Sequence, residues 1–271
     1  MQTEYSADDI TAASGLQVLS YLCVSMATLW IYDYVCSLHG EWAFLLQSRW
    51  SKAKCLYILA RNVPFVILTI DLYLYFTPNE NPDKCLMLIS IYSCFSCISV
   101  FCSEYIFVLR TYALWNNNKY VLAATICTSI AFLVASIYIA FTTVDASQVM
   151  TSTIPGITGC YRISRSFKLS TPFLLLFVFE LGLISLTFIR AMQSWRAVNS
   201  RVYTVLVKHN IFYYACGLFL AAVNVLMPTL FSQYAYHSVF EDFQFFILAI
   251  LATRMHLHLW HVGQVQDTVD I

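Results

Sequence analysis

Charged residues are scarce in this chain. Of its 271 residues, 11% are Asp, Glu, Lys or Arg, whereas 59% are hydrophobic, and the mean hydropathy is +0.67. A water-soluble domain carries about a quarter charged residues, because its surface has to be hydrated. This deficit excludes a soluble globular protein. It predicts an integral membrane protein whose main partner is the lipid bilayer.

Positive charge is missing from places where some functions need it. The first 14 residues contain Glu4, Asp8 and Asp9 but no Lys or Arg, so they do not have the basic start of a secretory signal peptide. No basic stripe lies outside the short loops, and we therefore expect no nucleic-acid partner. The formal net charge is zero, so only the positions of the charges are informative.

Motifs for catalysis and cofactor binding are absent as well. The sequence contains no HExxH pair, no GxSxG elbow and no phosphate-binding loop, and its last apolar run has no Lys that could hold retinal. Cys94 and Cys97 form a CxxC in the middle of an apolar run, where it is a weak signal for a metal. We expect no catalytic residue, no metal and no cofactor, and hence a protein that is not an enzyme.

Seven apolar runs are present, each long enough to cross a bilayer. Backbone groups in hydrocarbon must be hydrogen-bonded within their own segment, so each run is predicted to be a helix. The sequence therefore predicts an all-α, seven-transmembrane helix bundle that forms one domain, 1–271, with short tails at 1–15 and 261–271. The expected helices are 16–36, 53–76, 85–109, 120–142, 172–189, 209–231 and 240–260.

Basic residues are distributed unequally between the two sides of the predicted bundle. Ten Lys and Arg residues lie on the side of the first, third and fifth loops, and four lie on the other side. Because basic loops stay in the cytosol, we expect the N-terminus outside and the C-terminus in the cytosol. The plasma membrane is the expected location, and an endomembrane is the alternative.

Two of the ten cysteines fall on the predicted outer side, where disulfides persist. Cys85 begins the third predicted helix, and Cys160 lies in the long loop 143–171. A bridge between them would tie this loop over the mouth of the bundle. Two unpaired thiols are the alternative.

Charged residues inside the predicted spans gather in the cytosolic half of the bundle. Arg61 lies eight residues into its helix, or roughly 12 Å at about 1.5 Å per residue, which is too deep for full hydration. We predict that it pairs with Asp33 or Glu104, and that Arg110 and Arg254 belong to the same charge cluster. The cluster is interpreted as a structural lock, with a switch that opens on activation as the alternative.

A second set of polar residues lies nearer the outer half and the midplane of the predicted spans. Polar groups that converge among aromatic side chains are typical of a small-molecule pocket. The same groups could instead bond to one another across helices. The candidates for the ligand pocket are Asp71, Tyr92, Glu180, Asn224 and Gln244.

The segments WIYDYVCSLHGEWAF and RWSKAKCLYILARNVPF resemble a membrane domain of unknown function shared by fungal, mainly basidiomycete, seven-helix proteins. Where that domain has Asn-Arg-Tyr in its second helix, this chain has Ala60-Arg61-Asn62. The resemblance covers about the first quarter of the chain and implies an integral membrane protein, without an activity. The matching residues are Tyr32, Asp33, Tyr34, Glu41, Trp50 and Arg61, with Glu104 and Leu109 to Trp115 beyond the domain.

Two functions are compatible with this architecture. The first is a receptor-like signalling protein that senses a small or lipophilic ligand, with a cytosolic signalling partner at the basic third and fifth loops, 110–119 and 190–208. The fifth loop could equally lie against anionic lipid headgroups. The alternative is a transporter or proton-coupled carrier that uses the carboxylates of Asp71 and Glu180.

Overall fold

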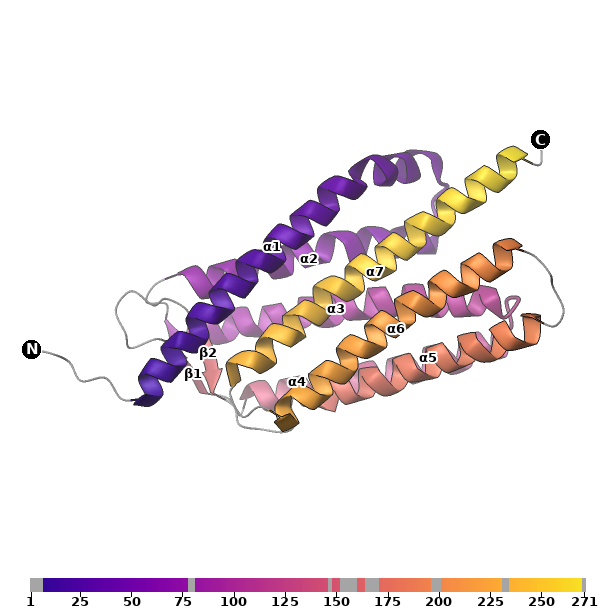
Figure 1. The fold of residues 1–271 in the computed structure, drawn as a ribbon. Helices are drawn as coiled ribbons and strands as arrows, with labels where there is room; N and C mark the ends of the chain where they lie inside the picture. Colours follow the sequence, from indigo (N-terminus) through magenta and orange to yellow (C-terminus); the bar gives the residue numbers. More distant parts are fainter. Residues whose placement is uncertain are drawn as a thin grey trace, which may run out of the picture.

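Seven long helices lie lengthwise beside one another in the computed structural model (Figure 1). The structure describes residues 7–77, 81–145, 148–151, 160–163, 171–195, 201–230 and 234–269. Seven helices in these ranges are long and apolar enough to cross a membrane, which confirms the predicted bundle. The helices are α1 (Ala7–Gln47), α2 (Lys52–Phe76), α3 (Pro82–Leu114), α4 (Lys119–Asp145), α5 (Thr171–Trp195), α6 (Arg201–Leu230) and α7 (Tyr234–Val269).

Most helices are longer than their apolar runs. The clearest case is α1, which was expected to end near Cys36 but continues through Ser37 and Glu41 to Gln47. An apolar run reports only the part of a helix that fits the hydrocarbon, whereas the helical backbone can continue into the polar layer. The extra turns matter here because they carry Ser37 and Glu41 to the buried charge cluster described below.

The ends of α3 follow from local sequence. Asn81 precedes the helix, and its side-chain oxygen accepts a hydrogen bond from the backbone N–H of Asp83 at 3.1 Å, while Pro82 occupies the first helical position. At the other end, Asn116 and Asn117 adopt positive φ angles of 53° and 58°, which helices rarely continue through. These signals fix where α3 enters and leaves the bundle.

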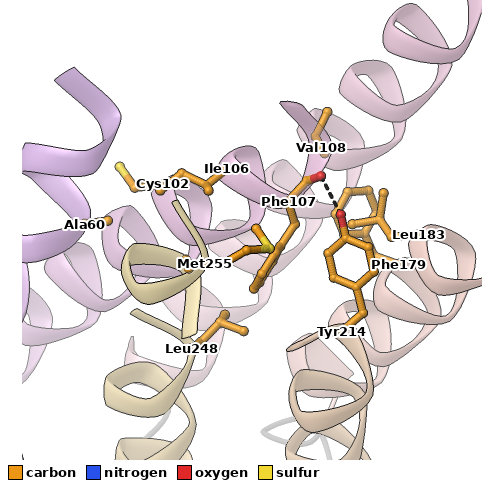
Figure 2. Packing of buried hydrophobic residues seen from close by; sticks show 11 residues of the cluster. Ala60, Cys102, Ile106, Phe107, Val108, Phe179, Leu183, Tyr214, Leu248 and Met255 are labelled. Atoms are coloured by element: carbon orange, nitrogen blue, oxygen red, sulfur yellow. Dashed lines mark hydrogen bonds between the residues drawn. The ribbon is translucent and has the colours of Figure 1, made fainter. Parts of the chain in front are cut away.

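The core lies where α3, α5, α6 and α7 meet, and Figure 2 shows its packing. The rings of Phe107 and Tyr214 meet edge to face with centroids 5.1 Å apart. The hydroxyl of Tyr214 donates to the backbone oxygen of Phe107 at 2.9 Å, the dashed line in Figure 2. A second apolar cluster around the fully buried Trp30 joins α1, α2 and α7. Helix α7 contributes to both clusters and therefore holds the two halves of the bundle together.

A short hairpin interrupts the loop between α4 and α5, and sequence analysis did not predict it. Strands β1 (Gln148–Thr151) and β2 (Cys160–Ile163) pair antiparallel, with Thr151 opposite Cys160. Cys85 is fully buried near the start of α3, where it packs with Leu74. The side chain of Cys160 lies outside the described residues, so its disulfide with Cys85 stays a prediction.

Candidate functional site

A buried charge cluster joins α1, α2 and α7. Helix α1 places Asp33, Ser37 and Glu41 four residues apart, so that all three lie on one face. Arg61 of α2 reaches this face: its Nη1 lies 2.6 Å from Asp33 Oδ2, and its Nη2 lies 2.6 Å from Glu41 Oε1. Nη2 also donates to the hydroxyl of Ser37, which itself donates to Glu41 Oε1 at 2.8 Å. The guanidinium thus binds two carboxylates at once.

Arg254 of α7 completes the cluster. Its Nη2 lies 2.7 Å from Asp33 Oδ1, so Asp33 bridges two guanidinium groups. The cluster of Asp33, Glu41, Arg61 and Arg254 therefore balances two negative charges with two positive ones. The guanidinium carbon of Arg61 also lies 5.2 Å from the ring centroid of Trp30, within the range of a cation–π contact. This balance allows three charged side chains to be buried in a span.

The cluster differs from the predicted one in its membership. The predicted pair of Arg61 with Asp33 is present, and Arg254 belongs to the cluster. Glu104 does not, because its side chain lines a different part of the bundle. Arg110 does not either, since its Nη2 lies 2.7 Å from Nδ1 of His256. Both residues therefore lie on faces of α3 that point away from the cluster of Asp33, Glu41, Arg61 and Arg254.

A cavity of about 200 Å³ lies between α3, α4, α5 and α7. Its wall is mainly apolar and aromatic. Phe173 of α5 and Phe245 of α7 stack there with centroids 6.3 Å apart. Along α3 the lining extends from Tyr92 to Glu104, a length of about 18 Å at about 1.5 Å per residue. This cavity was not predicted from the sequence, although Tyr92 was one of the residues predicted to line a pocket.

A hydroxyl group and a carboxyl group in the cavity wall have no basic or backbone partner among the described residues. Most serines of α3 donate to the backbone four residues earlier, as Ser93 does to the oxygen of Ile89 at 2.9 Å. The hydroxyl of Ser96 and both carboxyl oxygens of Glu104 have no hydrogen-bond partner among the described residues. Both side chains are buried, with 3% and 5% exposed. Unsatisfied buried polar groups cost about 1–3 kcal/mol each, so Ser96 and Glu104 are the candidates for polar contact with a molecule in this cavity.

Glu104 faces a second carboxyl group behind the cavity wall. The side chains of Glu104 and Glu180 interact directly and line one small space beside Tyr214 and Gly217. The carboxyl oxygens of Glu180 likewise have no partner in the rest of the described protein. Gly217 makes room for this pair, because a Cβ atom built on it would lie 2.9 Å from Glu180 Oε1.

The remaining candidates for the pocket lie elsewhere. Asp71 and Asp242 line a small separate cavity among α1, α2 and α7, and Tyr92 donates a short hydrogen bond to Asp242. Asn224 of α6 donates to Gln244 of α7 at 2.5 Å, so these two tie neighbouring helices together. Asp71, Glu180, Asn224 and Gln244 are buried and Tyr92 is partly buried, but the five do not line one common cavity. Asn224 and Gln244 match the alternative that such groups bond to one another across helices, whereas Asp71 and Glu180 lie in two separate small cavities.

Comparison with known protein families gives one match, and it covers part of the site. Residues 21–66 match a family of unknown function, DUF6533. This segment carries Asp33, Ser37, Glu41 and Arg61, and thus most of the charge cluster. No curated protein sequence matches the chain. The fungal origin implied by the resemblance stays a prediction.

Replacing Arg61 with Ala should destabilise the protein by about 3–5 kcal/mol, because it leaves two buried carboxylates without their shared partner. The measurement is the yield and the thermal midpoint of monodisperse protein in detergent. Arg49→Ala is the control, since Arg49 is exposed between α1 and α2. Equal loss in the two variants would show that the cluster does not support the fold.

Replacing Gly217 with Ala should displace Glu180 and lower the thermal midpoint, because the new methyl group would overlap the carboxyl group. Gly182→Ala is the matched control in α5, where a Cβ atom would meet nothing within 4 Å. Removing a helical glycine at an open position should stabilise the protein by about 0.5–1 kcal/mol. Opposite shifts in the two variants are expected, and a stabilising effect of Gly217→Ala would contradict the close approach.

Proposed function

We propose that this protein is a receptor-like membrane protein that binds a small, lipophilic molecule in the cavity between α3, α4, α5 and α7. The observation that carries the proposal is the pairing of an apolar, aromatic wall with the unpartnered side chains of Ser96 and Glu104. Ligand sites combine these two features, since the wall provides affinity and the few polar groups orient the ligand. The volume of about 200 Å³ favours a compact ligand.

The position of the cavity also supports a receptor-like role. Its floor, Glu104, lies on α3, and three residues further along the same helix Phe107 accepts the hydrogen bond of Tyr214 from α6. Tyr214 also lines the space shared by Glu104 and Glu180. A ligand that moves Glu104 would therefore act on the contact between α3 and α6. These helices lead to the third and fifth loops, where we place the cytosolic signalling partner.

The topology that this role requires is part of the proposal. We infer from the excess of Lys and Arg on one side that the N-terminus faces outward and the C-terminus the cytosol. On that topology the cavity extends inward from the outer half of the bundle. The plasma membrane is the location that suits a receptor for an external ligand.

The test uses 2-phenylethanol, a compact neutral probe, and protein in lipid nanodiscs. Val100→Trp places a large ring in the cavity wall and should abolish binding, which is measured by saturation-transfer NMR. Ile98→Trp carries the same ring on the exposed face of α3 and should bind like the unmodified protein. Equal signals from all three proteins would mean that the probe only partitions into lipid, and the cavity would not be the site.

A proton-coupled carrier is the second candidate, favoured by two carboxyl pairs that line small cavities inside the bundle, Asp71 with Asp242 and Glu104 with Glu180. Vesicle uptake separates the two functions. A carrier needs these carboxylates, so Asp71→Asn and Glu180→Gln should stop uptake. A receptor instead activates a cytosolic partner in cells without moving its ligand, and loses that response in Val100→Trp but not in Ile98→Trp.

A further inference from the structure

The charged side chains that line the cavity are all acidic. Its charged lining residues are Glu104 at the inner end and Glu241 on α7, and none of the lining residues in the described ranges is Lys, Arg or His. The nearest arginine along α3, Arg110, is held by His256, and Arg61 is held by the charge cluster. A ligand that carries a negative charge would find no counter-ion here.

We propose that the cavity selects an organic amine, whose protonated nitrogen binds the carboxylate of Glu104 while its apolar body packs against the aromatic wall. The inference rests on the proposed function, because it names the chemical class of the ligand for the same cavity. It is carried by the geometry of the site. Glu104 is 5% exposed and lines the cavity, and its carboxyl group faces the carboxyl group of Glu180, with no Lys, Arg or His of the described protein beside the pair.

The pair formed by Glu104 and Glu180 strengthens the case for a donor. Ionised carboxylates only accept hydrogen bonds. Two carboxylates that face each other therefore need either a shared proton or a donor from another molecule. An alkylammonium group supplies three N–H donors and one positive charge, and charge-assisted bonds of this kind are the strong ones. A neutral alcohol supplies one donor and no charge. The pair of Glu104 and Glu180 should therefore bind an amine more tightly than a neutral alcohol.

Ser96 provides an observation that is independent of the acidic residues. Its hydroxyl is 3% exposed, lines the same cavity two helical turns from Glu104, and has no partner among the described residues. Two helical turns correspond to about 11 Å, so one compact ligand can place its amine at Glu104 and a polar substituent near Ser96. The distance between these groups sets the length of the expected ligand.

The experiment compares 2-phenylethylamine with 2-phenylethanol and 3-phenylpropanoate, which share a phenyl ring and differ in charge. Binding is measured by titration of protein in nanodiscs, and Val100→Trp nanodiscs give the partition background. The unmodified protein should bind the amine about tenfold or more tighter than the alcohol, and the carboxylate weakest. Glu104→Gln should remove this preference, while Asp83→Asn, which neutralises an exposed carboxylate of α3, should keep it.

The two proposals fail in different ways. If the amine and the alcohol bind equally well, the selection for an amine is overturned, whereas binding to the cavity stands. If Glu104→Gln folds and keeps the preference for the amine, Glu104 is not the counter-ion and the inference is wrong. If neither compound binds above the Val100→Trp background, both proposals fail. The comparison of compounds on the unmodified protein depends on no variant, so it is informative even if Glu104→Gln does not fold.

Discussion

The bundle depends on the pairing of Arg61 inside an apolar environment. A guanidinium group cannot lose its charge at ordinary pH, and it cannot be left unpaired within a span without a large cost in free energy. Here it binds Asp33 and Glu41 of α1, while Asp33 also binds Arg254 of α7. The orientation of α1 and α7 about α2 follows from these bonds. Without them, contacts between apolar helices would specify their mutual rotation poorly, because lipid tails satisfy the same surfaces.

The half of the bundle that contains the cavity differs in how its buried polar groups are paired. Around the cavity, the hydroxyl of Ser96 is buried without a partner in the described protein, and the carboxyl groups of Glu104 and Glu180 face each other without a basic side chain beside them. Gly217 leaves the space that the carboxyl pair occupies. A fold maintained only for stability would replace such groups by apolar ones. The contrast between a cluster whose charges are paired and a cavity whose carboxyl group faces another carboxyl group is the basis for our proposal that the first supports the fold and the second binds a ligand.

Hydropathy was sufficient to predict the seven helices, because the bilayer demands long apolar segments. The pairing of Arg61 with Asp33 was also predictable, because both residues lie at matching depths on consecutive helices. The position of Glu104 opposite Glu180 was not predictable. In a membrane protein the faces toward lipid and toward the core are both apolar, so periodicity does not reveal which face of α3 a residue occupies. The cavity was missed for a related reason, since it depends on contacts between helices distant in sequence. The β1–β2 hairpin is a local pairing, and hydropathy did not predict it because it identifies only the long apolar spans.

The most direct test compares the thermal midpoints of two protein variants, Asp33→Asn in the charge cluster and Glu104→Gln in the cavity. Both are measured in the same detergent without ligand. Asp33→Asn removes an acceptor that two arginines share, so its thermal midpoint should fall well below that of the unmodified protein. Glu104→Gln gives the carboxyl pair the N–H donor it lacks, so its midpoint should be equal or higher. A loss in Glu104→Gln as large as that in Asp33→Asn would show that Glu104 supports the fold, and would contradict the account of the cavity.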